Sequence, residues 1–486
     1  MFKFFSISPS VEPFDEAKYK ALMDGLDFQE IKKSELENEF TIGAEYYGKK
    51  YVESISVVKR QKKTIPLGQM WILATDGDHG SPDYQESGVL YLLSECVKEG
   101  YIEKAKCRYI TEAKNRELKR SCLHPGDIVV TKTGVYFGKS AVIPESIPEA
   151  NTIAHVGKIT LKSQYNPYYV STFLNCKYGY CQLRRRGIKA TRPEIKLVEF
   201  PDIVIPEFSD RLYSAVEASV RKANTLLELA SGTMELSAKL IIDSLAVGSS
   251  HAERVSKALV SFKNSFQLTG RLDAEYYQLK YKNYEAAVFG ASNGYTFVKN
   301  EFVPVKKSCP RTLDNYNYVE IGDIDVGTGS AFANTVATEE LPDNAKIMTQ
   351  KGDLLVSTVR PNRGAVAILG NGDLLVSGAF TVLREDGDYP KEVLQVLLRT
   401  SMYRDWLLRF NVGTSYPVIK DEDVLNMPIP ILGDDIKQDV VAKVNESASL
   451  RRQSKQLLEY AKQAVEMAIE QGEDIALAWL KSKVEQ

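Results

Sequence analysis

The hexapeptide IGAEYY at residues 42–47 returns as LDAEYY at residues 272–277, an offset of 230 residues. The segment PGDIVVT at 125–131 has a counterpart, KGDLLVS, at 351–357, an offset of 226 residues. A glycine turn and a proline-ended strand also return, at offsets of 226 and 227 residues. Such turns are common enough to explain one pair, but not several pairs in the same order. The chain therefore contains an internal duplication, which has to be recognised before a fold is assigned.

Each half of the duplication follows the same plan. A short helical lead carries the AEYY motif, and short β-type runs separated by turn residues follow it. A helical segment comes next, around 167–185 in the first half and 390–410 in the second. A further glycine turn leads to a strand that ends in proline, and a long helix closes the half. The plan predicts an α+β protein with two tandem mixed α/β domains.

The two closing helices carry apolar residues at a spacing of seven, the pattern of a coiled coil. Each run is about 35 residues long and would span about 50 Å as a helix, longer than an average globular helix. An alternative is a pair of ordinary amphipathic surface helices. Two duplicated halves related by pseudo-twofold symmetry would instead pair these helices antiparallel. The predicted seam consists of Val216, Val220, Ala223, Leu227, Met234, Ile241, Val444, Leu458 and Val465.

The duplication and the helices together predict the domain boundaries. We expect an N-terminal lead over 1–40, a first α/β domain over 41–206 and a central spacer helix over 207–262. A second α/β domain over 263–432 and a C-terminal spacer helix over 433–486 complete the chain.

Composition excludes several classes of protein. The 486 residues carry a formal charge of −2, so the chain is not uniformly basic, although a local basic face stays compatible with nucleic-acid binding. The six cysteines lie outside any CxxC spacing, which predicts reduced thiols in a cytoplasmic protein and no structural zinc site. The start, MFKFFSISPSVEPFDE, lacks a signal-peptide pattern, and no apolar run is long enough to span a bilayer.

Charge is distributed unevenly between the two halves. Residues 41–200 hold 25 Lys and Arg against 16 Asp and Glu, whereas residues 271–432 hold 17 against 21. The run RRRGIKATR at 184–192 places five cations around a glycine turn, in a segment that we expect to be a loop. Such a run is often only a solvated face, but arginine beside tyrosine and threonine is also typical of phosphate and base contacts. In the acidic second half, a DNA-facing surface would require the cations to gather on one side.

The chain lacks the common catalytic motifs. No GxxxxGK[ST] loop, no GxGxxG fingerprint, no HExxH pair and no methyltransferase tetrapeptide is present. Asp76, Asp78 and His79 could serve in a metal- or acid-dependent hydrolase, but the neighbouring Gly and Pro indicate a turn. Asp127 and Asp353 each follow a glycine before an apolar strand, which predicts that they cap turns. We predict neither a catalytic residue nor a metal ligand.

With these features assembled, the chain resembles the specificity (S) subunit of type I restriction–modification systems from about residue 40 to the C-terminus. The motifs that carry the resemblance are DGDHGSP at 76–82, GDIVVTKTG at 126–134, YVEIGDI at 318–324 and GDLLVS at 352–357. The chain departs from the family in three respects. The second half lacks the DGDHGSP turn and is acidic, and the N-terminal lead is longer than usual.

The resemblance implies that each α/β domain is a target recognition domain that reads one half of a bipartite DNA site. It implies that the coiled coil sets the gap between half-sites and docks two methyltransferase subunits, to which restriction (translocase) subunits add. The chain itself would be non-enzymatic and bind no cofactor, with S-adenosylmethionine, ATP and Mg held by the partners. Alternatives are a subunit of another phage-defence system, an adaptor without DNA contact, or the hydrolase above.

The candidate DNA contacts combine the glycine-flanked hairpin of each half with the arginine-rich segments. They are Lys132, Thr133, Tyr136, Lys139, Arg184, Arg185, Arg186, Lys189, Arg192, Arg360, Asn362, Arg363, Arg404, Arg409 and Tyr416.

Overall fold

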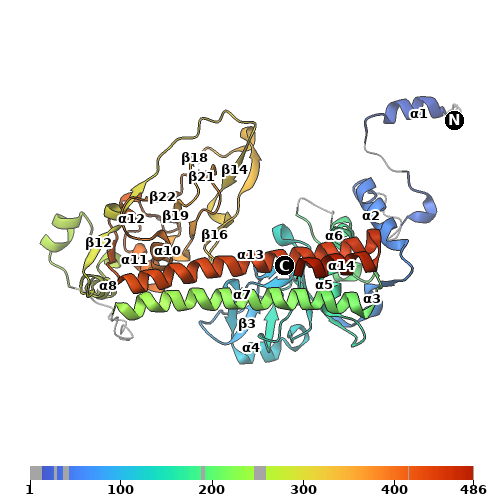
Figure 1. Ribbon diagram of the computed structural model, residues 1–486, viewed down its shortest axis with the longest axis horizontal. Coiled ribbons are helices and arrows are strands. Elements are labelled where there is room, and N and C mark those ends of the chain that lie inside the picture. Colours follow the sequence, from blue (N-terminus) through green and yellow to red (C-terminus); the bar gives the residue numbers. More distant parts are fainter. Residues whose placement is uncertain are drawn as a thin grey trace, which may run out of the picture. The chain divides into compact units, whose positions relative to one another are not determined.

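The protein consists of two compact units, shown in the computed structural model of Figure 1. The first unit comprises residues 1–222 and 457–486, and the second comprises residues 223–456. The structure describes residues 14–26, 30–36, 43–187, 192–245, 259–413 and 415–484. The division passes through both long helices, so that each unit contains a part of each, rather than leaving the helices as separate segments.

The described residues of the first unit form four small sheets. In strand order they are β1 (Thr64–Pro66) and β11 (Val204–Pro206); β2 (Trp71–Asp76), β10 (Val156–Leu161), β7 (Ile128–Thr131) and β8 (Ser140–Val142); β6 (Arg108–Ile110), β3 (Val89–Leu92) and β9 (Ala150–Thr152); and β4 (Val97–Lys98) and β5 (Tyr101–Ile102). In the second sheet, β7, β8 and β10 are largely buried, whereas β2 is mostly half-buried or exposed. The full burial of β7 fits its run of β-branched residues.

In the second unit, too, the residues that the structure describes form four small sheets. They are β12 (Tyr295–Phe297) and β23 (Pro428–Pro430); β13 (Phe302–Pro304), β22 (Phe380–Glu385), β19 (Leu354–Ser357) and β20 (Val366–Ile368); β17 (Asn334–Ala337), β14 (Asn315–Val319), β21 (Leu375–Ser377) and β18 (Ala345–Met348); and β15 (Ile324–Asp325) and β16 (Ser330–Ala331).

The sheets of the two units correspond one to one. Both units close the first strand of the domain onto the last, and both contain one parallel pair, β3 with β9 and β14 with β21. The Gly-Asp turns agree in detail. The Asp127 carboxylate accepts the backbone N–H of His124 at 2.8 Å, and Asp353 accepts that of Gln350 at 2.7 Å. The predicted duplication and the turn-capping roles of both aspartates are confirmed.

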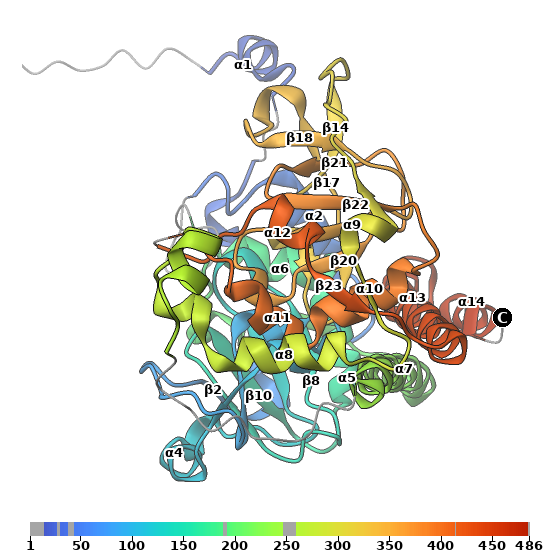
Figure 2. The ribbon, with the colours of Figure 1, turned by 90° about the vertical axis from the view of Figure 1, so that its left-hand side faces the viewer.

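Both units also contain helices, several of which occupy equivalent places in the duplicated plan. The first unit has α1 (Glu16–Met23), α2 (Lys49–Lys59), α3 (Leu67–Met70), α4 (Glu112–Glu117), α5 (Pro167–Asn175) and α6 (Lys177–Gly187). The second has α8 (Leu279–Phe289), α9 (Val298–Glu301), α10 (Lys391–Arg399), α11 (Ser401–Leu408) and α12 (Asp421–Leu425). Each helical segment expected around 167–185 and 390–410 is thus two helices. Figure 2 shows α8 beside α11, where Lys280 and Asp405 form an ion pair at 2.9 Å.

Side-chain caps explain where these helices begin. The Asn166 side chain accepts the N–H of Tyr169 at 3.0 Å, directly before Pro167 at the first position of α5. Thr400 caps α11 in the same way. The apolar face of α10 is buried in the core of the second unit together with Trp406. Among the described residues, no helix is long and apolar enough to cross a membrane.

The two long helices are α7 (Asp210–Ser244) and α13 (Asp434–Gln471), and α14 (Glu473–Val484) follows a break at Gly472. In the second unit Ile241 shares a core with Val440 and Val444, and Ala230 contacts Ser447 further along, so the helices run antiparallel there. The predicted α+β fold with a duplicated domain and two long helices is confirmed. Most predicted seam residues are buried, whereas Leu227 and Met234 are only half-buried.

Small residues occupy much of the seam. Buried positions recur every seven residues through Ala223, Ala230 and Ser237 on α7, and through Ser447 and Ser454 on α13. Small side chains let two helix backbones approach, and the Ser447 hydroxyl donates a hydrogen bond to the Ala230 carbonyl at 2.7 Å. Ser454 is fully buried, and its hydroxyl has no hydrogen-bond partner among the described residues. The seam therefore gains specificity from polar positions that an apolar heptad search misses.

These two serines allow a matched comparison. Ser447→Ala removes the hydrogen bond between the helices, so we expect a loss of about 1 kcal/mol, or roughly 2–4 °C in melting temperature. Ser454→Ala removes an unpaired buried hydroxyl, so the melting temperature should stay unchanged or rise. Thermal unfolding of the full chain followed by circular dichroism measures both. Equal effects of the two substitutions would contradict this seam geometry.

Candidate nucleic-acid interface

The arginines at 184–186 lie on the last turn of α6 and not in a loop, which corrects the sequence-based expectation. Arg185 is 4% exposed; its Nε donates to the Tyr46 carbonyl at 2.8 Å, and its guanidinium lies 4.0 Å from the centre of the Tyr46 ring. Arg186 is 3% exposed and donates to the carbonyls of Gln182 and Asp202. These two side chains stabilise the fold and are unable to face a ligand.

The second unit repeats this arrangement with Arg409. Its Nε donates to the Tyr276 carbonyl at 3.1 Å, its guanidinium lies 4.5 Å from the centre of the Tyr276 ring, and it forms an ion pair with Glu285. The expected DNA contact at Arg409 is therefore also corrected to a structural one. The AEYY motif binds an arginine in both units, the buried Arg185 in the first and the half-buried Arg409 in the second. The arginine lies 139 residues from its tyrosine in the first unit and 133 in the second.

Arg399 is also engaged within the second unit, and Arg404 packs on the turn before β20. Arg399 donates to the carbonyls of Val326, Gly327 and Thr328, and burial lowers its pKa to about 10. The stem of Arg404 packs against Gly364, because a Cβ added there would lie 2.8 Å from Arg404 Cδ. Arg404 is half-buried and its Nε is enclosed, and its predicted contact with DNA stays a prediction.

The hairpin between β7 and β8 presents cations and aromatic rings at the surface of the first unit. Its tip contains the 3₁₀ turn Gly134–Tyr136, where Val135 is exposed and the amine of Lys139 lies 5.7 Å from the centre of the Tyr136 ring. Lys98 flanks the same ring at 5.4 Å. The exposed Arg192 packs its guanidinium against Gly134. We call this set, together with the half-buried Arg184, the first hairpin surface.

Two of the expected hairpin contacts are not at the surface. Lys132 is buried, and its amine forms an ion pair with Asp76 at 3.0 Å. Thr133 is buried, and its hydroxyl has no hydrogen-bond partner among the described residues. Lys189 lies outside the described residues, so its placement stays a prediction.

The equivalent hairpin of the second unit joins β19 to β20 through the 3₁₀ turn Pro361–Arg363. Arg360 adopts a left-handed conformation (φ +51°), and its guanidinium lies 5.3 Å from the centre of the exposed Tyr416 ring. Asn362 and Arg363 are exposed at the tip. These four residues are the second hairpin surface. The same β-hairpin thus presents arginine or lysine beside an aromatic ring in both units.

A basic segment that was not predicted from the sequence lies on α4 and the turn after it. Lys114 is half-buried, and Arg116, Lys119 and Arg120 are exposed. Four cations in the ten residues TEAKNRELKR at 111–120 could have indicated it, but three interspersed acidic or amide residues obscured the pattern. This segment adds to the positive charge of the first unit.

The Asp76, Asp78 and His79 turn is held by ion pairs. Asp76 contacts Lys132 at 3.0 Å, Arg120 at 3.3 Å and His79 at 3.6 Å. Burial raises the pKa of Asp76, but the hydrogen bond and charge of Lys132 outweigh this and hold it below the ordinary value. Among the described residues, no group of three or more His, Cys, Asp and Glu side chains is placed to hold a metal. The arrangement serves a charged turn and gives the hydrolase alternative no support.

Comparisons with known proteins show only weak structural similarity. No family model and no curated protein matches the chain. The HsdS subunit from Thermoanaerobacter tengcongensis is 12% identical, with 84% of this chain and 97% of that chain covered, at a TM-score of 0.26. The type I restriction–modification S subunit from M. genitalium is 10% identical, with 87% of this chain and 96% of that chain covered, at a TM-score of 0.36. The type IIG endonuclease BpuSI is 10% identical, with 40% of this chain and 30% of that chain covered, at a TM-score of 0.30.

Proposed function

We propose that this chain is a non-catalytic, sequence-specific DNA-binding subunit whose two units each read one half of a bipartite site. One observation carries the proposal: the same β-hairpin is built twice in one chain, each time with a cation beside an aromatic ring, half-buried Lys139 in the first unit and exposed Arg360 in the second. Cations bind backbone phosphates and aromatic or amide groups contact bases, so such a surface suits duplex DNA. Two copies in one chain suit a site of two different halves.

The long helices support a further part of the proposal, namely that they set the gap between the half-sites and dock partners. We propose two methyltransferase subunits and restriction (translocase) subunits as those partners, in keeping with the resemblance noted from the sequence. S-adenosylmethionine, ATP and Mg would then be bound by the partners. The antiparallel contacts within the second unit and the length of α7 and α13 suit a rigid spacer.

A binding selection tests the proposed function. The full chain, alone and with a methyltransferase subunit, is incubated with duplexes that carry a randomised central segment, and the bound fraction is sequenced. We expect enrichment of two short constant blocks separated by a gap of constant length and free sequence. Binding should weaken with salt, with a slope near −0.9 for each phosphate contact. A chain that retains no sequence above background would instead be a protein–protein adaptor.

A further inference from the structure

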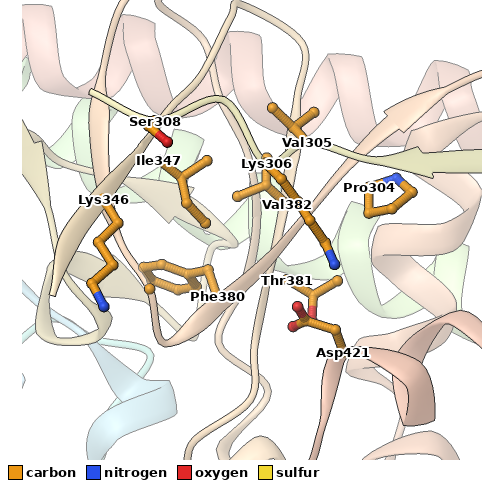
Figure 3. A pocket seen from close by; sticks show the side chains of 11 residues that line it. Pro304, Val305, Lys306, Ser308, Lys346, Ile347, Phe380, Thr381, Val382 and Asp421 are labelled. Carbon is orange, nitrogen blue, oxygen red and sulfur yellow. The ribbon is translucent and has the colours of Figure 1, made fainter. Parts of the chain in front are cut away.

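A surface cavity of about 310 Å³ opens on the second unit between the sheet of β13 and β22 and the edge strand β18. Its inner wall is apolar and includes the buried Phe380. Charged side chains stand around it. Figure 3 shows the amine of Lys306 pointing toward Thr381 and Asp421, with Lys346 on the other side of Phe380.

The polar groups of this cavity are held in place but not neutralised. The Thr381 hydroxyl donates to Oδ1 of Asp421 at 2.7 Å, which fixes the carboxylate and leaves Oδ2 without a hydrogen bond from the described residues. The amines of Lys306 and Lys346 form no ion pair or hydrogen bond within the described part of the chain, and both side chains are exposed. A fixed acceptor and a long donor therefore stand side by side, available to a ligand.

Several other basic residues of the second unit are engaged within that unit. Ion pairs or backbone carbonyls engage a group of its other basic residues, namely Arg271, Lys280, Arg311, Arg384, Lys391, Arg399 and Arg409. The cavity, by contrast, has two exposed lysines at its mouth, and Lys307 is exposed beside them. The acidic second unit therefore presents positive charge at this place, as it also does with the exposed Arg360 and Arg363 of the second hairpin surface.

The strand register identifies the same place in the first unit. In the first unit Ile128, which follows the Gly-Asp turn, pairs with Ile159 of β10, and Ile159 pairs with Ala74 of β2. In the second unit Leu354 follows the turn and pairs with Leu383 of β22, which pairs with Pro304 of β13. Two residues further on stand Asp76 in the first unit and Lys306 in the second. Corresponding positions thus carry opposite charges in two units of one fold.

The first unit fills the space that is open in the second. A Cβ added to Gly157, which stands where the second unit has Thr381, would lie 3.5 Å from the side chains of both Lys132 and Leu197. Lys132 is in turn neutralised by Asp76. The fold can therefore close this site, and the cavity with its unpaired charges is particular to the sequence of the second unit. Two units that read different half-sites are expected to differ at positions that discriminate bases.

We propose that Lys306 and Asp421 read one cytosine–guanine pair in the half-site of the second unit, an inference that rests on the proposed function. In the major groove, guanine offers O6 and N7 as acceptors and cytosine offers its N4 amino group as a donor. The Lys306 amine donates to guanine, and the free oxygen of Asp421 accepts from cytosine. Lys346 contacts an adjacent phosphate and carries no base preference.

The selection from randomised duplexes is repeated with Asp421→Asn, Lys306→Met and Lys346→Met in the full chain. Asp421→Asn keeps an acceptor for Thr381, so the unit stays folded, but replaces the free oxygen by an amide of changed hydrogen-bonding character. We expect the preference for cytosine–guanine at one position of one half-site to fall roughly tenfold or more in Asp421→Asn and Lys306→Met. Lys346→Met should weaken all sequences equally and reduce the salt slope by about one.

Two controls keep the outcomes distinct. Lys282→Met removes an exposed lysine of α8 away from the cavity and should leave the selected sequences unchanged. Lys139→Met on the first hairpin surface should leave this half-site unaltered. If the parent chain selects a bipartite site and the Asp421 and Lys306 variants select the same site with equal preference, the inference is overturned and the proposed function stands. If the parent chain selects nothing, the proposed function fails, and this inference with it.

Discussion

Seven residues inserted after Ala230 in α7, with seven inserted before Ser447 in α13, are expected to widen the gap of the recognised DNA site by about three base pairs. One heptad preserves the seam register, and the two insertion points face each other across the pair, since Ser447 donates to the Ala230 carbonyl. Seven helical residues add roughly 10 Å, and successive base pairs are about 3.4 Å apart. The half-site sequences should stay as they are, because neither hairpin surface is changed.

The measurement is the selection from randomised duplexes, compared between the parent chain and the insertion variant. The parent site should lose most of its affinity for the variant, because two half-sites at the old spacing no longer meet both units at once. A heptad inserted in α7 alone serves as the control and should abolish bipartite selection, since the facing seam residues are then out of step. An unchanged gap in the double insertion would rule out the helices as a spacer and leave them only a docking role.

Arg185→Met is expected to destabilise the first unit by about 3 kcal/mol. The substitution removes a charged hydrogen bond to the Tyr46 carbonyl and the stacking of a guanidinium on the Tyr46 and Tyr47 rings, while it keeps an apolar side chain of similar length. For a unit of this size the melting temperature should fall by roughly 6–12 °C. Calorimetry of the full chain measures the change.

Arg184→Met on the same helical turn is the matched control. Arg184 is half-buried, and its guanidinium lies over Phe137 at 6.0 Å, next to the first hairpin surface. We expect little change in melting temperature and a DNA salt slope lower by about one. The opposite pattern, with a stable Arg185 variant that has a reduced salt slope, would assign Arg185 to DNA and contradict its structural role.

Local features explain why much of the architecture could be derived from sequence. The Gly-Asp turns need only a glycine with positive φ (Gly126, +90°; Gly352, +92°) and a carboxylate that caps the backbone one turn back, so a dipeptide predicts them. The long helices are equally local, because an apolar spacing of seven follows from helical periodicity. The motifs occur twice in the same order along the chain, and this repeated order predicts two equivalent domains.

Burial is the property that sequence proximity fails to predict, and it decides the role of each arginine. Arg184, Arg185 and Arg186 are neighbours in sequence, yet successive residues on a helix point about 100° apart, so one faces the hairpin and two face the interior. Their partners, Tyr46 and Asp202, lie in other parts of the chain. Likewise, only the tertiary structure could join Asp76 to Lys132.

The sequence by itself determined that the chain is duplicated, that each copy is a mixed α/β domain and that two long helices follow them, because periodicity and turn chemistry act over a few residues. Only the tertiary structure decided which cations reach solvent, that the second unit has an open site between Lys306 and Asp421, and that the first unit fills the same place with Lys132. The physical reason is that exposure and pairing depend on packing between segments distant in sequence, where a buried charge must find its partner or remain at the surface.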